Sequence, residues 1–550
     1  MPTPNQKNRR TIHDEFLRIA GDYAGRTLFR AEGGQGRSYT YGQVAEFVSC
    51  FSRSLRADGS MDTPEIGLLS ENCPEWCISY LSILAAGRTV LPIDTRLKPE
   101  EIRSIVTHAR LRTVVVSAAL APILSEMADD LHLISLDDDS PDSWRHLLKS
   151  DPEPTLPFHN ETAVIIYTSG TTGTPKTVEL THANLLANLE GVRSSIQFDE
   201  HDVFLSILPL YHTFEATCGF LTPLMSGATI VYARSLKSKE IIEDLSRNRA
   251  TVMCGMPLLY EKMYYSFRRK IAAAPWFRRM LFRVLYVLSG ILWKLGFKVS
   301  RLLFRSLRGR AGMDSIRIFV SGGAAIPSSI ARFFNLIGFD FIQGYGMTEA
   351  SPVITVHRPE NIKFGSVGPP LNNVEVRIDS PDEAGIGEII ARGDNISPGY
   401  RDNPEATAEL VRDGWLYTGD LGRMKDGHLW ITGRRKSLIV SASGKNIYPE
   451  ELEEKLVEHA IVLEAVVFGR KKQGRQGEEV RAIIVPDQQC WDCESSSTKL
   501  DEDKINQAIK DAVAEVNSHV ATYKRIVGYE IQYEELEKTS TRKVKRFLYQ

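Results

Sequence analysis

The sequence lacks three features that would place it in a specialised class of protein. Lys and Arg total 67 and Asp and Glu total 69, so no overall charge attracts nucleic acid, and any attraction to an anionic membrane must be local. The amino-terminal stretch MPTPNQKNRRTIHDEF has no apolar segment followed by a small-residue cleavage site, so no secretory signal is predicted. Only seven cysteines occur among 550 residues, which favours a reducing compartment and a cytoplasmic location over a disulfide framework.

Two pairs of cysteines are spaced closely enough to be considered as metal or redox sites. Cys490 and Cys493 form an isolated CxxC pattern, and Cys73 and Cys77 form a CxxxC pattern. A structural zinc site needs four ligands, and neither pair has a second pair or a histidine cluster nearby. The sequence therefore predicts neither zinc binding nor redox chemistry at these positions.

The chain is longer than one hydrophobic core usually supports, so we expect more than one domain. Apolar runs of strand length alternate with helical stretches up to about residue 370, which is typical of an α/β fold. Short strands then precede a compact stretch that ends in two helices, 449–459 and 501–519. We predict an α/β protein with a large amino-terminal domain over 1–433, built of α/β subdomains and a short-stranded β subdomain, and a small α+β carboxy-terminal domain over 434–550. The expected strands span residues 65–69, 113–117, 163–167, 229–232, 317–321, 374–378, 388–391 and 428–432.

The strongest chemical signal is the segment YTSGTTGTPK, from Tyr167 to Lys176, which follows a buried-type strand. Glycines let backbone N–H groups approach an anion, hydroxyls donate to its oxygens, and the lysine adds positive charge. The pattern differs from the Walker P-loop, because Pro175 stands where that loop has glycine before the lysine. An ordinary polar loop is the alternative, and the density of threonine, serine and glycine argues against it. The segment is predicted to bind phosphate.

This loop resembles the phosphate-binding motif of the adenylate-forming enzymes, which include acyl-CoA synthetases, luciferases and the adenylation domains of peptide synthetases. Further blocks follow in that family's order, and together they cover about Tyr39 to Arg546. One block alone would be weak evidence, whereas seven in order indicate the family. The other six are Pro209-Leu-Tyr-His212, Ser321-Gly-Gly-Ala324, Gly344-Tyr-Gly-Met-Thr-Glu349, Tyr417-Thr-Gly-Asp420, Gly433-Arg434-Arg435-Lys436 and Lys538-Thr-Ser-Thr-Arg-Lys543.

The resemblance implies a first reaction in which a carboxylate attacks the α-phosphate of ATP and expels pyrophosphate. Because two anions must meet, positive charge and a metal ion are required. Glu349 is implied as the Mg²⁺ ligand, since this ion keeps several waters and one carboxylate suffices, and Thr348 as a donor to the α-phosphate. Taken alone, Glu349 would be interpreted as a surface carboxylate. The residues implied to hold the β- and γ-phosphates are Thr168, Ser169, Gly170, Thr171, Thr172 and Gly173, with Lys176 in support.

The same resemblance implies a slot for adenosine and a clamp for its ribose. Asp420 is implied to accept both ribose hydroxyls, with Arg434 also at the ribose; a turn aspartate is the alternative for Asp420. His212 is implied to lie by the acyl carboxylate and the route of the thiol, and a buried structural histidine is the alternative. The residues implied at the adenosine slot are Gly322, Gly323, Ala324, Gly344, Tyr345 and Gly346.

The second reaction, attack by the coenzyme A thiol, implies that the small domain is mobile. In the family this domain swings about a hinge between the two half-reactions. Lys436 occupies the hinge position, and Lys543 occupies the position of the lysine that bridges carboxylate and phosphate during adenylation. A charge on a solvated tail is the alternative for Lys543.

The sequence departs from the family pattern in two places. Thr177 stands where the family usually has glycine, and if that position needed a positive φ, a β-branched residue would be strained by roughly 1–3 kcal/mol. Glu537 and Arg542 replace the usual proline and glycine around the last lysine, which leaves Lys545 as an alternative to Lys543.

The stretch 267–310 narrows the range of candidate acid substrates. It holds basic, aromatic and leucine side chains and no acidic residue, and its longest uncharged run, 284–293, is about half of a spanning helix. We predict one or two basic amphipathic helices that contact an anionic membrane surface peripherally; a helical hairpin packed on the protein is the alternative. Long-chain acyl-CoA synthetases carry a similar insertion, and His212–Glu215 and Ser443–Glu450 also resemble that subgroup. The resemblance therefore implies a long-chain fatty acid as the substrate. An enzyme that draws such an acid from a membrane gains from lying on it, because free long acyl chains are scarce in water.

Two other functions stay open. A fatty acyl-AMP ligase or acyl-carrier-protein synthetase would share the first reaction, but such ligases typically carry an added segment, and the short path from Glu349 to Gly365 favours coenzyme A. A catalytically silent lipid-binding or membrane scaffold protein is the other alternative, and the presence of Lys176 and Asp420 argues against it. The predicted ligands are the fatty acid, ATP, coenzyme A and Mg²⁺, with no nucleic acid.

Overall fold

The computed structural model describes residues 10–30, 37–57, 63–127, 130–137, 143–148, 161–168, 176–471, 477–487, 502–538 and 544–549. These residues form two compact units. The first contains the described residues up to 375 together with 391–416, and the second contains 376–390 and 417–549. The predicted α/β class, with a large amino-terminal part and a smaller carboxy-terminal part, is confirmed.

A seven-stranded sheet in the first unit has the order β17-β8-β7-β4-β3-β5-β6. Strands β3 to β7 pair in parallel, and the last two strands at one edge, β8 and β17, are antiparallel. All five residues of β3 are buried, as expected for a parallel sheet that is covered on both faces. The strands are β3 (Glu65–Leu69), β4 (Thr89–Pro92), β5 (Thr113–Val116), β6 (His132–Ser135), β7 (Thr162–Thr168), β8 (Lys176–Thr181) and β17 (Gly399–Tyr400).

An eight-stranded sheet in the same unit has the order β14-β13-β12-β11-β9-β10-β1-β2. Its inner strands are parallel, and its edge strands β2 and β14 are antiparallel to their neighbours. The carboxyl ends of β9, β11, β12 and β13 therefore meet at one edge of the sheet, where ligands bind in open α/β sheets. The strands are β1 (Thr27–Arg30), β2 (Tyr39–Thr40), β9 (Val203–Ser206), β10 (Thr229–Tyr232), β11 (Val252–Gly255), β12 (Ile318–Ser321), β13 (Asp340–Gly346) and β14 (Val353–Val356).

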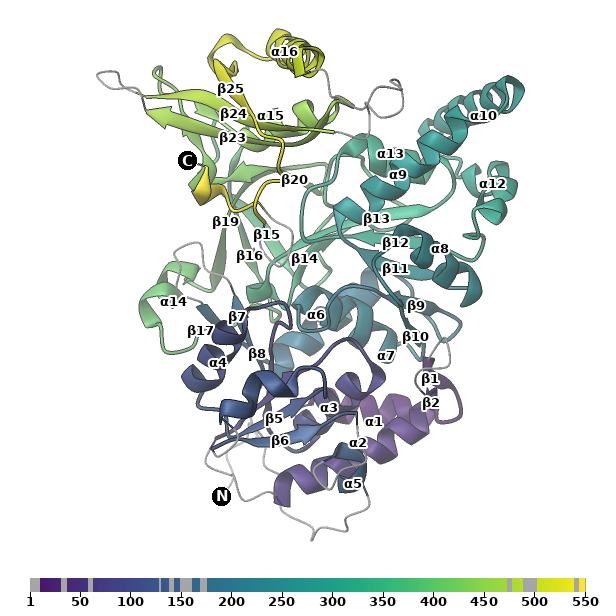
Figure 1. Ribbon diagram of the computed structural model, residues 1–550, viewed down its shortest axis with the longest axis vertical. Helices are drawn as coiled ribbons and strands as arrows, with labels where there is room; N and C mark the ends of the chain where they lie inside the picture. The colour runs from purple at the N-terminus through teal and green to yellow at the C-terminus, as the bar shows by residue number, and fades with distance from the viewer. Residues whose placement is uncertain are drawn as a thin grey trace. The chain divides into compact units, whose positions relative to one another are not determined.

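Helices cover both sheets of the first unit (Figure 1). The helix α3 is apolar on nearly all sides and is buried almost throughout, whereas α9 and α13 pack one aromatic face on the eight-stranded sheet. The helices are α1 (Ile12–Asp22), α2 (Tyr41–Ala57), α3 (Pro74–Ala85), α4 (Pro99–His108), α5 (Trp144–Leu147), α6 (His182–Ser195), α7 (Thr222–Leu224), α8 (Ser238–Arg247), α9 (Pro257–Ala272), α10 (Trp276–Lys294), α11 (Ser300–Leu303), α12 (Arg305–Arg310), α13 (Ser328–Leu336) and α14 (Pro404–Leu410).

The later part of the chain forms shorter sheets, as expected from its turn-rich sequence. One has the order β15-β16-β19-β18, with β20 paired to β19, and another has the order β23-β24-β25. Helices α15 (Pro449–Val457) and α16 (Glu502–Ser518) bury their apolar faces against the second of these sheets. The strands are β15 (Glu375–Asp379), β16 (Gly387–Arg392), β18 (Val411–Arg412), β19 (Trp415–Lys425), β20 (His428–Arg434), β21 (Ile439–Val440), β22 (Asn446–Ile447), β23 (Val462–Lys471), β24 (Glu478–Pro486) and β25 (Gly528–Ile531).

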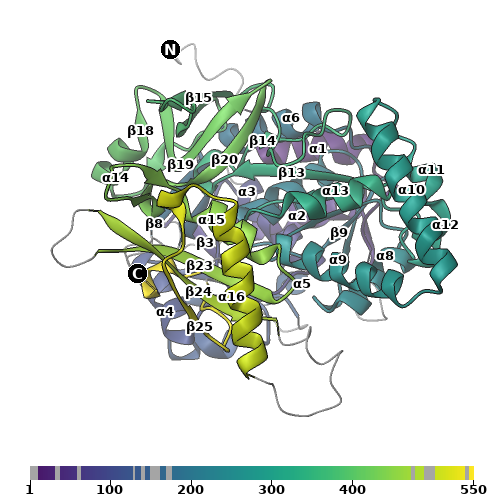
Figure 2. The same cartoon turned by 90° about the horizontal axis from the view of Figure 1, so that it is seen from above.

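The basic stretch 267–310 forms the end of α9 and the helices α10, α11 and α12, at the edge of the first unit beyond α13 (Figure 2). One face of α10 packs on the protein: Phe282 lies against Phe333 of α13, and Ser289 donates to the Leu336 carbonyl oxygen at 2.8 Å. The opposite face leaves apolar side chains exposed. Within the described residues, no helix is long and apolar enough to cross a membrane.

One of the basic residues counted in this stretch does not belong to an exposed surface. Arg308 is buried, donates to the backbone carbonyls of Gly338 and Ile316, and lies over the ring of Phe339. Burial lowers the pKa of Arg308 to about 10. From the sequence, all the basic residues of 267–310, Arg308 among them, were assigned to basic amphipathic helices. For Arg308 this assignment is wrong, because its guanidinium closes the turn after α12 instead.

Glu215, in a π-helical turn (Glu215–Leu221), is a buried carboxyl that the predicted chemistry does not use. Its Oε1 accepts a hydrogen bond from the Ser206 hydroxyl at 2.6 Å, while its Oε2 has no partner among the described residues. Burial raises the pKa of Glu215 to about 8. The carboxyl is therefore largely protonated at pH 7, because its hydrogen bonds with Ser206 and with the backbone of Ile207 do not compensate for its burial.

This raised pKa predicts a pH-dependent stability. Between pH 4.5 and about 8 the folded state holds a proton on Glu215 that the unfolded state releases, so the free energy of unfolding falls as the pH rises, by about 1.4 kcal/mol per pH unit. Glu215→Gln removes this loss. Relative to the wild type, the variant should gain about 2–3 kcal/mol between pH 5.5 and pH 7.5, measured by chemical denaturation. Glu190→Gln, at an exposed position, is the control, and its free energy of unfolding should change with pH as that of the wild type does. The same pH dependence in Glu215→Gln as in the wild type would contradict the raised pKa of Glu215.

Candidate active site

The two ends of the predicted phosphate loop lie side by side. Strand β7 ends at Thr168 and β8 begins at Lys176, and these two residues are paired across the antiparallel ladder. The Thr168 hydroxyl donates to the Lys176 carbonyl oxygen at 3.1 Å. The intervening predicted residues, Ser169, Gly170, Thr171, Thr172 and Gly173, lie outside the described part of the chain. The hairpin therefore places a threonine hydroxyl and a lysine at the mouth of one loop.

Thr177, which departs from the family pattern, is an ordinary strand residue. It pairs with Tyr167, and its carbonyl oxygen accepts from the Arg401 N–H at 2.9 Å. Its φ is not positive, so the strain considered for a β-branched residue does not arise. A β-branched side chain suits this extended position.

Glu349 lies in a 3₁₀ turn (Thr348–Ala350) after β13 and is only 8% exposed. Its Oε1 accepts a hydrogen bond from the Tyr400 hydroxyl at 2.7 Å, and its backbone carbonyl accepts from the Ser397 N–H at 2.8 Å. The ammonium of Lys176 lies 4.5 Å from the centre of the Tyr400 ring. Burial and the charge of Glu349 raise the pKa of Tyr400, so this hydroxyl keeps its proton and donates. Tyr400 is the residue that sequence reasoning missed, because its surroundings, SPGYRD, carry no chemical signal.

Two asparagines hold the turn that carries Glu349. The amides of Asn188 in α6 and Asn395 each donate to the carbonyl oxygens of both Ala350 and Val353. At the other end of the turn, a side chain on Gly346 would overlap the Pro352 carbonyl oxygen, so only glycine fits there. The turn is thus fixed on both sides by close packing and hydrogen bonds.

The predicted adenosine residues lie at the carboxyl ends of two neighbouring strands. Gly322, Gly323 and Ala324 follow β12, where Gly323 has a φ of +82° and a Cβ on Gly322 would meet the Phe214 ring. Gly344, Tyr345 and Gly346 end β13, which pairs with β12 in parallel. The structure therefore brings these two predicted groups to the same edge of the sheet. The stacking of adenosine on Tyr345 stays a prediction.

His212 follows β9 and is half-buried. Its Nε2 lies 3.4 Å from a guanidinium nitrogen of Arg96, whose Nε donates to the Tyr211 hydroxyl at 2.7 Å. The next residue, Thr213, has its hydroxyl 3.4 Å from that of Thr348. His212 is thus near the turn that carries Thr348, and Arg96 is a positive charge there that the motifs did not indicate.

Within the second unit, Asp420 and Arg434 face each other on β19 and β20. Their side chains form an ion pair of 3.1 Å between Nε and Oδ1, and Asp420 is largely buried. Glu388 of β16 accepts from the Gly419 N–H at 3.0 Å and from Arg435 at 2.6 Å. Lys436 lies in the following 3₁₀ turn (Arg435–Ser437), so one carboxylate secures the residues directly before Asp420 and Lys436.

Lys543, the predicted adenylation lysine, lies outside the described residues. Its alternative, Lys545, lies 3.6 Å from Glu537, and Lys538 pairs with Glu464 of β23. The hinge at Lys436 and the role of Lys543 therefore stay predictions.

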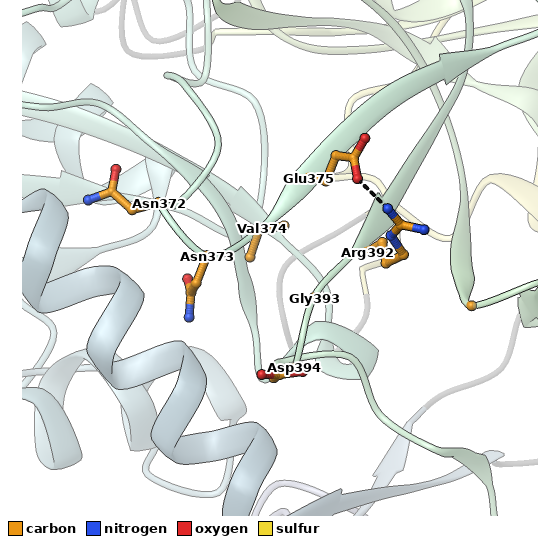
Figure 3. Close-up of a pocket in the computed structure, with 8 residues that line it drawn as sticks. Asn372, Asn373, Val374, Glu375, Arg392, Gly393 and Asp394 are labelled. Atoms are coloured by element: carbon orange, nitrogen blue, oxygen red, sulfur yellow. Dashed lines mark hydrogen bonds and ion pairs between the residues drawn. The ribbon is translucent and has the colours of Figure 1, made fainter.

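A pocket of about 740 Å³ lies in the first unit (Figure 3). It is formed by Asn372–Glu375 and Arg392–Asp394 with Gly414, and no predicted site residue lines it. Arg392 forms a 2.7 Å ion pair with Glu375 and lies over the Trp415 ring, so its charge is already engaged. The volume of this pocket does not by itself identify a function for it.

The donor set fits a magnesium ion carried with a nucleotide. Among the described residues no group of three or more His, Cys, Asp or Glu side chains is placed to hold a metal ion by itself. Glu349 offers a single carboxylate with one oxygen bound to a neutral hydroxyl. Mg²⁺ is commonly held by one or two carboxylates together with phosphate oxygens and water, so one such residue is sufficient.

Comparison with known proteins finds relatives whose names specify different acid substrates. The chain is 30% identical to the peroxisomal long chain acyl-CoA synthetase 6 of Arabidopsis thaliana, over 85% of this chain and 72% of that protein. It is 29% identical to the long-chain-fatty-acid–CoA ligase FadD15 of Mycobacterium bovis, over 92% and 89% of the two chains. It is also 29% identical to feruloyl-CoA synthase of an Amycolatopsis species, over 82% and 84%.

The fold is shared with solved structures. ATP-bound MatB from Rhodopseudomonas palustris superposes with a TM-score of 0.78 at 23% identity, covering 98% of each chain. The AMP-binding enzyme family matches residues 16–401, and the AMP-binding enzyme C-terminal domain matches residues 436–548. The chain belongs to the AMP-binding enzyme family.

Proposed function

We propose that this AMP-binding enzyme joins a long-chain fatty acid to coenzyme A through an acyl-adenylate, releasing AMP and pyrophosphate. The observation that carries the proposal is the convergence of Lys176 and Glu349 on the Tyr400 side chain. A cation and a carboxylate suited to Mg²⁺ therefore lie together at the mouth of the loop between β7 and β8. This combination serves a triphosphate, whose charge must be neutralised before a second anion can approach.

In the proposed first reaction the chain's own residues bind and orient the two anions. The loop after Thr168 binds the β- and γ-phosphates, Lys176 supplies positive charge, and the Thr348 hydroxyl donates to the α-phosphate. Glu349 holds Mg²⁺, which neutralises phosphate charge when bound. Arg96, beside His212, offers guanidinium donors to the incoming carboxylate, and its charge is shared with Asp94 at 3.8 Å. Lys543 then bridges carboxylate and phosphate.

The second unit supplies the ribose clamp and the movement between half-reactions. Asp420, paired with Arg434, accepts the ribose hydroxyls, and a rotation about Lys436 withdraws Lys543 so that the thiol of coenzyme A reaches the adenylate carbonyl. The relatives named for coenzyme A esters support coenzyme A as the acceptor. Relatives named for long-chain acids support a fatty acid as the substrate, whereas the relative named feruloyl-CoA synthase makes an aromatic acid the competing candidate.

This function predicts a specific pattern of acid dependence. Pyrophosphate exchange into ATP should be stimulated at least tenfold by a fatty acid of long chain length, and less by ferulate or short-chain acids. Adding coenzyme A should convert the fatty acid to its thioester, measured by mass spectrometry. Stronger exchange with ferulate than with fatty acids would contradict the fatty acid as the substrate. Thioester formation only on an acyl carrier protein would contradict coenzyme A as the acceptor.

The variant Lys543→Ala tests the role of this lysine in the first reaction. Because the lysine acts in adenylation, the variant should lose exchange by about a hundredfold or more, as expected when a charge that stabilises the transition state is removed. It should still convert supplied acyl-adenylate to the thioester. Equal loss of both reactions would show that Lys543 is misassigned.

We further propose that α10 brings the enzyme to the fatty acid by lying on an anionic membrane surface. Its exposed side chains recur at helical spacing along one face, and Trp276, at the start of the helix, is 73% exposed. Arg283 and Lys294, on one margin of this face, are also exposed. An apolar stripe with flanking basic residues is typical of a helix in the membrane interface. The stripe consists of Phe277, Met280, Leu281, Val284, Val287, Leu288 and Ile291.

The membrane proposal predicts the effect of removing apolar area from α10. The double variant Leu281→Ser/Val284→Ser should bind vesicles containing phosphatidylserine roughly thirtyfold more weakly, because two half-inserted side chains contribute about 1 kcal/mol each. Sedimentation with the vesicles measures the bound fraction. The control double variant Leu236→Ser/Val527→Ser removes exposed apolar side chains elsewhere and should bind as the wild type does. Equal binding by both double variants would contradict the proposal.

A further inference from the structure

Tyr400 touches both Lys176 and Glu349: its hydroxyl donates to Glu349 Oε1 at 2.7 Å, and its ring centre lies 4.5 Å from the Lys176 ammonium. The two contacts use different parts of the side chain. One is a hydrogen bond to the hydroxyl, and the other is a cation–π contact with the ring. They can therefore be removed separately.

The position of the Tyr400 ring is fixed relative to Lys176. Tyr400 pairs with Val178 in the strand that begins at Lys176, and the next residue, Arg401, donates its N–H to the Thr177 carbonyl oxygen at 2.9 Å. The Tyr400 N–H donates to the Thr407 hydroxyl at 2.9 Å. Because two hydrogen-bonded strands move together, the positions of Tyr400 and Lys176 relative to each other are fixed.

The kind of donor that meets Glu349 is informative. A buried carboxylate is usually held by a cation, as Asp202 is by Arg317 at 2.8 Å in this protein. Glu349 instead receives a neutral hydroxyl, and within the described chain no basic side chain forms an ion pair with it. A hydroxyl orients a carboxylate without cancelling its charge, so the charge stays available to a divalent cation.

We propose that Tyr400 is a positioning residue with two separable tasks: its hydroxyl orients the Glu349 carboxylate for Mg²⁺, and its ring holds Lys176 beside the triphosphate. The inference rests on the proposed function, since it requires that the protein bind MgATP. It adds a residue whose surroundings in the sequence give no indication of a role.

The first test separates the hydroxyl from the ring by measuring ATP affinity with Mg²⁺ and with EDTA. Tyr400→Phe keeps the ring and removes the hydroxyl. The gain in ATP affinity that Mg²⁺ gives should fall by roughly tenfold, as expected for the loss of a hydrogen bond to a charged group, while affinity in EDTA should not change. Isothermal titration calorimetry measures both values without requiring catalysis.

The second test removes the ring. Tyr400→Leu should lose the gain from Mg²⁺ and should also weaken ATP binding in EDTA by roughly threefold to tenfold, because the contact with Lys176 is lost. Adding Tyr400→Phe to Glu349→Gln should change nothing further in the response to Mg²⁺, since the hydroxyl acts through that carboxylate. The Phe variant is nearly isosteric, so the test stands even where the Leu variant fails to fold.

A matched control lies in the same unit. The hydroxyl of Tyr39 donates to Glu75 at 2.9 Å, so Tyr39→Phe removes a tyrosine–glutamate hydrogen bond away from the site and should leave both affinities unchanged. An unaltered Mg²⁺ response in Tyr400→Phe, with the wild type binding MgATP, would overturn this inference alone. A wild type that binds no MgATP would overturn the proposed function together with it.

Discussion

The central constraint on the site is the antiparallel pairing of β8 between β7 and β17. Pairing with β7 closes the phosphate loop, because it sets Thr168 beside Lys176. Pairing with β17 places Tyr400 over the same lysine, although the two residues are more than two hundred positions apart. The Glu349 turn is then drawn to this edge by Ser397 and by Tyr400 itself. A short ladder of backbone hydrogen bonds thus assembles groups from three distant segments.

Much of the fold could be predicted from the sequence, because the signal for parallel strands is local. The runs 65–69 and 229–232 are strands with those bounds, and most of the other expected strands differ by one or two residues at their ends. Such runs are apolar throughout, since both faces of the sheet are covered. Charged stretches were harder to interpret: from the sequence Arg308 is expected at the surface, but backbone carbonyls that come together only in the fold accept hydrogen bonds from its guanidinium.

The candidate site was predictable where chemistry concentrates in a motif, and not where it depends on packing. Lys176 and Glu349 stand within blocks that resemble the family's motifs, so the resemblance implied a role for each. Tyr400 and Arg96 stand among ordinary loop residues, and only tertiary contacts reveal what they touch. The doubt about Thr177 had the same origin, since its backbone angle depends on a pairing with Tyr167 that no composition encodes.

The carboxylate of Glu388 links two parts of the second unit that the proposed mechanism treats separately. It accepts hydrogen bonds from the residue before Asp420 and from the residue before Lys436. In the proposed mechanism, a rotation about Lys436 would therefore either stretch the Arg435 contact or pull on the turn that carries Asp420. Ribose recognition and rotation of the small domain would then share one mechanical linkage, through which an occupied nucleotide site could bias the direction of the swing.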